Sequence, residues 1–539
     1  MKKFMKSIQM MVALLVAVAA TTACSNDDNI ADEPNTTTDA PKTYTMTVEA
    51  TMGDDEATTR ALLIDGTGAL NATWTAGDVV SVYKQIDANT SENYGTLTAT
   101  NVSADGKSCM LTGELTSAPA VNAELTLQFN SGGYVSQKGT LDYIATHCDV
   151  AKATVTVASV TDKVITTTGG ANFVNQQAIV KFTLKKPDGT PFAAHYLTVK
   201  YGGTTIKVTP DAAASDLYVA IPGNTAKVTL TAFSDDNAYT YEKSGVAFTN
   251  GQYYTVGVKM QEMAASKDLS TLTADYEAKD GELLTGTLDG STQPYKVSIA
   301  SGATVMLKDA AINGVHVDYD TYKWAGITCA GNATIILTGA NTVKGFNKNY
   351  PGIFIPSGKT LTIKGGGSLD ASSNGMSAGI GGYIEHNKDV GVACGNIRIE
   401  GGTVTATGGN GHPGIGSGCD ASCGDIIITG GTVTANGGLR AAGIGSGAEG
   451  KFSSITIGEG VTSVTATAGY NNMDSTPLDP IGKGYGDTGS GAVIIDGTTA
   501  WTAGTATEHL NFAASTVQMS YPNTSYQNKD VTRWTLTRK

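Results

Sequence analysis

Residues 401–418 read GGTVTATGGNGHPGIGSG and residues 430–447 read GGTVTANGGLRAAGIGSG, so nearly the same eighteen residues occur twice, 29 positions apart. Weaker copies lie on both sides of this pair. Each stretch ends in a glycine-rich GIG element, PGIGSG (413–418) or AGIGSG (442–447). The isoleucine of this element recurs at positions 327, 353, 380, 415, 444 and 481, with spacings of 26 to 37 residues. A repeat of this length, built from short apolar runs and glycine corners, is typical of a solenoid.

The alternation inside one repeat indicates how its strands are oriented. Successive side chains of a strand face opposite sides, so Ile397, Ile399 and Val404 are expected to point inward while Thr403 and Thr405 point outward. One unit is too small to bury its apolar face alone, and it can do so only against the units before and after it. The pattern therefore predicts strands that stack from one repeat to the next.

We predict an all-β protein whose residues 265–500 form a parallel β-helix, right-handed, with six or seven coils. A β-propeller would need four antiparallel strands in each blade, whereas each unit here offers only two or three short runs. The tail 501–539 is richer in aromatic residues. Because a solenoid must cover its open apolar end, we predict that this tail is a C-terminal cap.

The region 43–262 has a different pattern. Short alternating runs such as TYTMTVEA (43–50) and AIVKFTL (178–184) follow one another about every ten residues, with Gly, Asn and Asp between them. This spacing is typical of an antiparallel β-sandwich, and the length of the region suits two subdomains.

The first residues are expected to be a targeting segment. Lys2, Lys3 and Lys6 precede an apolar run that is too short to span a bilayer, so we predict a signal peptide over residues 1–23. The small residues before Cys24 resemble a bacterial lipobox, in which the cysteine thiol is lipidated; ordinary secretory cleavage is the alternative.

The polar, acidic segment 24–42 cannot bury apolar area and is predicted to be a disordered tether. Acidic residues directly after a lipidated cysteine resemble the surface-export signal of Bacteroidales lipoproteins. The expected location is therefore the cell outer membrane, with a lipid anchor and exposure at the surface.

Several segments of the first region resemble fimbrillin-like proteins, the pilus subunits and pilus-tip relatives of the Bacteroidales. The matching stretches are ATTRALL (57–63), ATWTAGDVVSVY (72–83) and FTNGQYYTVGVKM (248–260). In such pilins an early arginine marks proteolytic processing, and Arg60 is the residue at the matching position; an exposed arginine at a strand start is the alternative. The resemblance implies fimbrial subunits as partners, although the long continuation of this chain favours a tip or stand-alone display role.

Composition argues against several functions. The net charge is −13 and no basic stripe is present, which argues against nucleic acid as a partner. Parallel β-helices often resemble polysaccharide lyases, but residues 265–500 contain only two arginines, Arg398 and Arg440, at different places in the repeat, and no acidic position recurs from coil to coil. We therefore predict no enzymatic activity and no catalytic residues, with a polysaccharide lyase or hydrolase as the alternative.

Metal sites are not expected either. His386 and His412 lie in glycine-rich loops, and CDASC (419–423) offers one pair of ligands without a second pair. Cys394 and Cys423 each precede a glycine that opens a repeat. If the repeats stack, their side chains lie on adjacent coils within disulfide range; an unbonded stack of small buried side chains is the alternative.

The repeats also resemble the β-helical carbohydrate-binding domains of secreted bacterial proteins. That resemblance implies acidic plant polysaccharides and Ca²⁺ as ligands, but it rests on scaffold residues, and no cofactor is predicted. Sugars are bound by aromatic faces flanked by polar groups. The densest such cluster in the sequence consists of Asp318, Tyr319, Asp320, Tyr322 and Trp324. The alternative is that these side chains cover the N-terminal end of the β-helix.

Together these patterns predict a surface-exposed lipoprotein that acts as an adhesin or binds a glycan or a host surface ligand, and that is associated with fimbriae as a tip or accessory protein. A structural pilus subunit is the remaining alternative.

Overall fold

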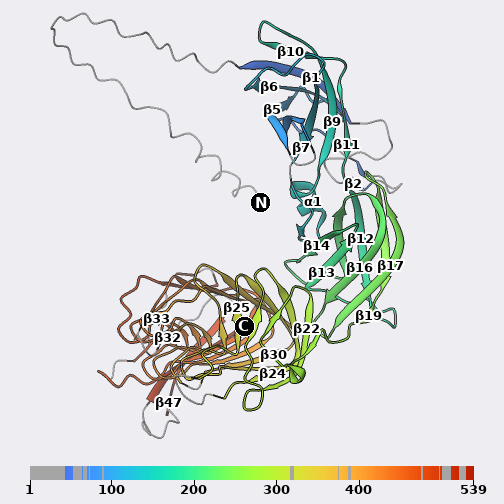
Figure 1. The fold of residues 1–539 in the computed structure, drawn as a ribbon. Coiled ribbons are helices and arrows are strands. Elements are labelled where there is room, and N and C mark those ends of the chain that lie inside the picture. Colours follow the sequence, from blue (N-terminus) through green and yellow to red (C-terminus); the bar gives the residue numbers. More distant parts are fainter. Residues whose placement is uncertain are drawn as a thin grey trace, which may run out of the picture. The chain divides into compact units, whose positions relative to one another are not determined.

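The structure is a computed structural model that describes residues 43–52, 63–64, 70–71, 73–87, 90–130, 132–315, 321–373, 375–385, 390–474, 477–496, 498–499, 512–520 and 530–538. Nearly every regular element in these ranges is a strand. They contain one α-helix, α1 (Leu141–His147), and one 3₁₀ turn, η1 (Leu269–Thr271). The predicted all-β class is confirmed (Figure 1).

The first lobe is a single sheet whose ladder closes on itself. Strand β1 pairs antiparallel with β6 along one edge and parallel with β10 and β11 along the other. The order β10-β1-β11-β9-β7-β4-β5-β6 is therefore closed. Its strands are β1 (Tyr44–Met52), β4 (Val79–Gln85), β5 (Ser91–Thr100), β6 (Ser108–Leu115), β7 (Glu124–Phe129), β9 (Ala151–Thr161), β10 (Val164–Thr167) and β11 (Ala171–Asn175).

The second lobe is a sandwich of two sheets, with the orders β15-β12-β18 and β19-β17-β16-β13-β14-β8. The chain reaches it early, because β8 and α1 lie between β7 and β9 in sequence, and β8 pairs with β14. The strands are β8 (Ser136–Gln137), β12 (Ala178–Lys185), β13 (Tyr196–Tyr201), β14 (Thr204–Val208), β15 (Asp216–Ile221), β16 (Asn224–Phe233), β17 (Ala238–Phe248), β18 (Tyr253–Lys259) and β19 (Gln261–Glu262). The two lobes are thus interleaved in the sequence.

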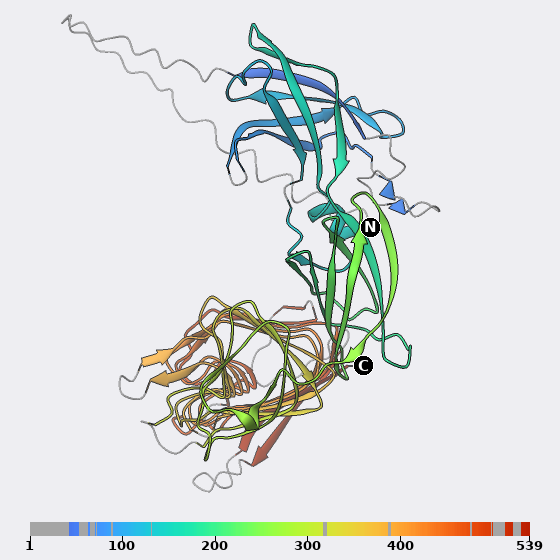
Figure 2. The same cartoon turned by 45° about the vertical axis from the view of Figure 1, so that its right-hand side comes forward.

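Most of the remaining strands stack in parallel as three columns, so the predicted parallel β-helix is confirmed (Figure 2). The first column is β20 (Lys267–Asp268), β22 (Glu282–Asp289), β24 (Thr304–Asn313), β26 (Ala333–Thr338), β29 (Thr360–Gly365), β34 (Asn396–Ile399), β38 (Ile426–Ile428), β42 (Ser454–Ile457) and β45 (Ala492–Ile495). The second follows the end of β24 with β27 (Ala340–Lys344), β30 (Ser368–Ser372), β35 (Thr403–Thr407), β39 (Gly431–Asn436) and β43 (Val461–Thr467).

The third column is β21 (Tyr276–Ala278), β23 (Val297–Ile299), β25 (Ile327–Cys329), β28 (Ile353–Phe354), β31 (Ile380–Gly381), β36 (Ile415–Gly416), β40 (Ile444–Gly445) and β44 (Ile481–Gly482). It contains eight strands, so the six or seven predicted coils were too few. The two strands that were missed, β21 and β23, read YEA and VSI, with Tyr276 and Val297 where the other six strands have the recurring isoleucine. Short extra strands lie outside the columns at β2 (Leu63–Ile64), β3 (Leu70–Asn71), β32 (Tyr383–Glu385), β33 (Val390–Val392), β37 (Ser422–Cys423), β41 (Lys451–Phe452) and β46 (Thr498–Thr499).

The interior of the β-helix is one continuous apolar core. Ile397, Ile399 and Val404 are fully buried, while Thr403 is exposed and Thr405 half-buried, as the alternation predicted. Fully burying one such aliphatic side chain contributes roughly 1.5–3 kcal/mol. Each rung adds only a few of them, so its stability depends on the rungs above and below.

The GIG element is explained by close approach of the backbone between rungs. Gly416 has a φ of +138°, and a Cβ there would lie 1.8 Å from the carbonyl oxygen of Gly445 on the next rung. Only glycine fits such a position. The repeat is therefore a steric requirement of the stack.

The last parallel rung is covered by a hairpin of β47 (Phe512–Ser520) and β48 (Asp530–Arg538). Strand β48 pairs antiparallel with β43, and its Trp534 and Leu536 are buried in the same core as the rungs. These two strands are the described parts of residues 501–539, and the role of that tail as a cap stays a prediction.

Candidate functional site

The second lobe and the β-helix share a small, fully buried apolar joint. Tyr196 and Phe233 of the lobe, whose rings stack at 5.0 Å, lie in one cluster with Leu283, Met306 and Ile336 of the β-helix, each at most 2% exposed. Polar contacts continue the joint, since the Lys308 ammonium donates to the Asn237 side chain at 2.9 Å and the Thr338 hydroxyl donates to the carbonyl of Asp235 at 3.1 Å.

The three β-helix side chains of this joint belong to one outward-facing column. Leu283 is paired with Met306, Met306 with Ile336, and Ile336 with Lys364 on successive strands. The column is therefore apolar on β22, β24 and β26 and charged on β29. The change marks where the cover by the second lobe ends and an open cavity begins.

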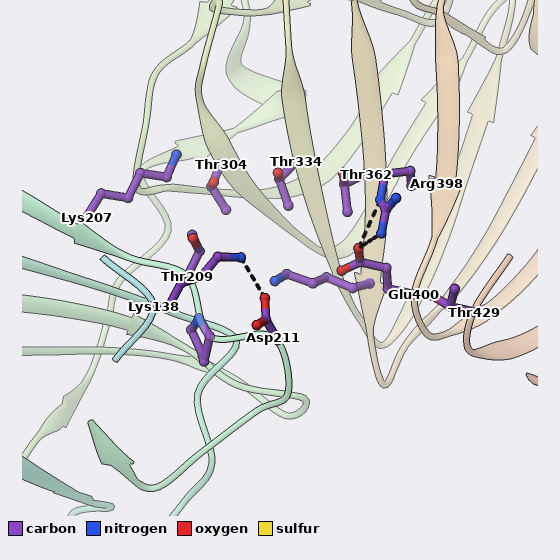
Figure 3. A pocket seen from close by; sticks show the side chains of 12 residues that line it. Lys138, Lys207, Thr209, Asp211, Thr304, Thr334, Thr362, Arg398, Glu400 and Thr429 are labelled. Carbon is purple, nitrogen blue, oxygen red and sulfur yellow. Dashed lines mark hydrogen bonds and ion pairs between the residues drawn. The ribbon is translucent and has the colours of Figure 1, made fainter. Parts of the chain in front are cut away.

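That cavity has a volume of about 760 Å³ and lies between the second lobe and the outer face of the first column (Figure 3). Its floor is formed by side chains from five successive strands of the column, and its opposite wall by residues around β8 and β14. The lining residues are Lys138, Lys207, Thr209, Pro210, Asp211, Thr304, Thr334, Thr362, Lys364, Arg398, Glu400 and Thr429.

The floor carries a row of hydroxyl groups that ends in a cation. Thr304 pairs with Thr334, Thr334 with Thr362, and Thr362 with Arg398, so these side chains follow one another rung by rung. Figure 3 shows the four side chains in this order on neighbouring strands. Rungs are about 4.8 Å apart, so the row offers evenly spaced donors and acceptors.

The charges of the cavity are unevenly paired. Lys138 binds the exposed Asp211, with 2.6 Å between Nζ and Oδ1, and Arg398 donates from Nε and a terminal nitrogen to Glu400 at 3.2 and 3.1 Å. The lining residues thus contain four cationic side chains and two carboxylates. The cavity has a surplus of positive charge on a chain whose net charge is −13.

Two lining residues, Lys364 and Thr304, are largely buried and have a side-chain polar group without a hydrogen-bond partner in the described structure. Lys364 is only 8% exposed, and within the described ranges its ammonium makes no hydrogen bond or ion pair. Burial lowers the pKa of Lys364, with Glu400 acting in the opposite direction. Thr304 is 1% exposed and its hydroxyl oxygen has no hydrogen-bond partner in the described structure. A buried polar group without a hydrogen-bond partner is costly, and Thr304 carries such a group at the floor of the cavity.

The predicted glycan contacts are a different set of residues. Asp318, Tyr319 and Asp320 lie outside the described residues. Tyr322 and Trp324 are 5.4 Å apart between ring centroids, and both are partly buried against the core of the β-helix. Those two aromatic residues therefore cover apolar surface, and their role in glycan contact stays a prediction.

Cys394 and Cys423 lie on adjacent coils, as predicted. The amide of Cys394 donates to the carbonyl of Ser422, and the amide of Gly424 donates to the carbonyl of Cys394, so the two cysteines face each other in a ladder. Both are buried free thiols in the structure, the Cys423 thiol donating to the carbonyl of Gly395. The arrangement has the adjacency that a disulfide needs, and the bond itself stays a prediction.

Lipidation of Cys24 and processing at Arg60 concern residues outside the described ranges, as does His386. His412 is fully buried, its Nδ1 lying 2.8 Å from the carbonyl of Asn410. Among the described residues, no three His, Cys, Asp or Glu side chains are grouped as a metal site would require. The same part of the chain contains no helix of the length and hydrophobicity that would cross a membrane.

Comparison with known proteins agrees with the architecture. The family model described as a beta helix repeat matches residues 397–419 and 426–448. A search of curated proteins found no match.

Solved structures similar to this chain include three from Bacteroides. A candidate cell adhesion protein of Bacteroides uniformis is 15% identical, over 40% of this chain and 93% of that one, with a TM-score of 0.22. One from Bacteroides ovatus is 14% identical, over 40% and 94%, with a TM-score of 0.25. A fimbrial protein of the same species is 12% identical, over 42% of this chain and 52% of that one, with a TM-score of 0.20. These neighbours are described as cell adhesion and fimbrial proteins, and the likeness concerns fold alone.

The cavity could not be predicted from the sequence, because its lining residues span positions 138 to 429 and come from both the second lobe and the β-helix. One signal was present. Runs such as VML (305–307) and IIL (335–337) break the alternation, because Met306 and Ile336 are apolar at outward positions. Apolar outward residues on one side of a solenoid indicate that another part of the protein covers that side.

Proposed function

We propose that this protein is a surface adhesin that binds an anionic glycan in the cavity between the second lobe and the β-helix. The observation that carries the proposal is Lys364, which is 8% exposed and has no ion-pair partner in the described structure, beside a row of threonine hydroxyls. A carboxylate or sulfate group of a sugar would supply the missing counter-charge, since a buried charge without a partner is strongly unfavourable. The threonine hydroxyls would both donate to and accept from sugar hydroxyls.

The same geometry gives little support to catalysis. Glycoside hydrolysis uses two carboxyl groups on either side of the scissile bond. Here Asp211 and Glu400 are each engaged by a cation, so neither is presented as a free acid or base. We therefore propose binding without turnover.

Anchoring and location belong to the same proposal. Cys24 would carry the lipid and hold the adhesin at the outer face of the outer membrane, with fimbrial subunits as further partners. Metabolic labelling with a fatty acid, compared between the wild type and Cys24→Ala, tests the anchor. Protease accessibility on intact cells tests the exposure, and a protein that is protected until the cells are broken would contradict it.

The binding is tested on the purified protein with a panel of acidic and neutral oligosaccharides. We expect acidic members such as tetragalacturonate to bind, and Lys364→Met, which keeps the length of the side chain and removes its charge, to weaken binding about tenfold. Thr334→Trp should block binding by filling the cavity. The matched control is Thr434→Trp, on the outward face of the second column, which should bind normally. Equal binding by both tryptophan variants would contradict the cavity as the site.

A further inference from the structure

One carboxylate outside the lining set holds both walls of the cavity. Asp280 lies in the turn between β21 and β22, and its side chain accepts three hydrogen bonds. Its Oδ2 accepts from the hydroxyl of Tyr196 at 2.9 Å, and its Oδ1 accepts from the ammonium of Lys207 at 2.9 Å and from the amide of Thr304 at 2.6 Å. Two of these donors belong to the second lobe and one to the floor of the cavity.

The contact fixes the direction of the Lys207 ammonium. A lysine ammonium has three donors. One of them goes to Asp280 and a second to the carbonyl of Gly302 at 2.8 Å, while Nζ lies 5.5 Å from the centroid of the Tyr196 ring. One donor therefore remains for a ligand, and its direction is set by the other two.

The same carboxylate fixes the first rung of the threonine row. The amide of Thr304 donates to Asp280, and the hydroxyl of Thr304 is the one without a partner. A displaced Thr304 would break the register of the hydroxyl groups, because each is set by the strand before it. Asp280 thus positions both the Lys207 ammonium and the residue that carries the Thr304 hydroxyl.

We propose that Asp280 is a positioning residue of the glycan site: it holds Lys207 on one wall and Thr304 on the other at the separation that the ligand requires. The inference rests on the proposed function. Asp280 adds negative charge beside a site for anions, and this charge by itself would weaken ligand binding. Asp280 can strengthen binding only by positioning Lys207 and Thr304.

Two substitutions separate these effects because they remove the same charge. In Asp280→Asn, the amide oxygen can still accept from Lys207 and Thr304 while the amide nitrogen donates to the Tyr196 hydroxyl. In Asp280→Ala, all three contacts are lost. We expect Asp280→Asn to bind tetragalacturonate as tightly as the wild type or more tightly, and Asp280→Ala to bind about tenfold more weakly than Asp280→Asn. Equal affinities of the two variants would overturn the inference and leave the proposed function intact.

A double-mutant cycle identifies the group that is positioned. Lys207→Met should weaken binding in the Asp280→Asn background and have little further effect in the Asp280→Ala background, where Lys207 is already misplaced. Lys344→Met, a cation on the second column outside the cavity, should have no effect in either background. Additive losses of Lys207→Met and Asp280→Ala would count against positioning.

A measurement without ligand keeps the inference testable if tetragalacturonate fails to bind. Amide hydrogen exchange at Thr304 should be slow in the wild type and in Asp280→Asn and clearly faster in Asp280→Ala. Equal protection in the two variants would overturn the positioning role whatever the ligand. Unequal protection without any glycan binding would show that Asp280 positions Thr304 and would reject both the proposed function and the role of Asp280 in a glycan site.

Discussion

The buried His412 makes the β-helix sensitive to mild acid. Its side chain is fully buried, Nδ1 hydrogen-bonds to the carbonyl of Asn410, and Nε2 has no partner among the described residues. Burial lowers the pKa of His412 to about 4, with the hydrogen bond to Asn410 acting in the opposite direction. The imidazole is therefore neutral in the folded protein down to that pH.

The sign of the effect follows from proton uptake. Between pH 6.5 and about 4 the unfolded chain binds a proton at His412 and the folded chain does not, so the free energy of unfolding falls as the pH is lowered through this window. One pKa unit corresponds to about 1.4 kcal/mol, so the total loss at His412 is on the order of 3 kcal/mol. Above pH 6.5 the contribution is complete and no longer changes.

Carboxylates also titrate in this range, so a variant is needed to isolate the histidine. His412→Asn keeps a donor for the carbonyl of Asn410 and cannot be protonated. The assay is amide hydrogen exchange of peptides from residues 397–448, corrected for the intrinsic pH dependence, which gives a local free energy of opening. The stability advantage of the wild type over His412→Asn should shrink by about 3 kcal/mol between pH 7 and pH 4. His147→Asn, in α1 and outside the measured peptides, provides the control for the substitution itself, and the exchange of residues 397–448 should match that of the wild type. A constant difference between wild type and His412→Asn across the window would refute the reasoning.

Three further predictions concern the scaffold. Gly416→Ala should abolish soluble folded protein, because the added Cβ would lie 1.8 Å from the carbonyl oxygen of Gly445. The control is Gly358→Ala, where φ is +73° and no atom lies within 4 Å of the added Cβ. It should lower the free energy of unfolding by only about 1–2 kcal/mol in a thermal unfolding assay. Ile336→Ala should destabilise the joint by about 2–5 kcal/mol and Ile427→Ala, half-buried on the same face outside the joint, by much less; equal shifts in denaturation midpoint would mean that the joint is not packed. Mass spectrometry of protein from the cell surface should find Cys394 joined to Cys423, while Cys329, whose pKa burial raises to about 12, stays unbonded and resists alkylation in the native state; two alkylated peptides at 394 and 423 would reject the bond.

The stack of rungs could be predicted from sequence because its physical cause is local. Period-2 alternation places Ile397 and Ile399 inside, and the close approach at Gly416 recurs at Gly381 and Gly445, so these copies of the repeat share both features. The first rungs were missed for the same reason. Strands β21 and β23 lack the recurring isoleucine, and without it a three-residue run such as VSI does not differ from any other short apolar run.

The path of the chain in the first two lobes depended on long-range pairing that no local pattern contains. The pairing of Ser136–Gln137 with β14 takes the chain into the second lobe before β9 returns it to the first. A run of two residues gives no periodic signal, so only the assembled sheet reveals this crossing. The closed ladder of the first lobe could not be predicted for the same reason. The sequence of β1 does not indicate whether one or both of its edges are paired.

The position of the cavity along the β-helix depends on which residues of one outward-facing column are apolar. The outward column reads Leu283, Met306, Ile336 and then Lys364, and the second lobe covers the three apolar members. A fourth apolar residue would have extended the joint and removed the cavity, whereas a charged residue two rungs earlier would have prevented the joint from forming. The substitution Lys364→Leu should therefore extend apolar contact toward the second lobe and raise the thermal midpoint, as replacement of a buried charge by an apolar side chain often does, while binding of acidic sugars is lost. Stability and recognition oppose each other at this residue, and a Lys364→Leu protein that gained stability and kept its affinity would show that the charge is not there for a ligand.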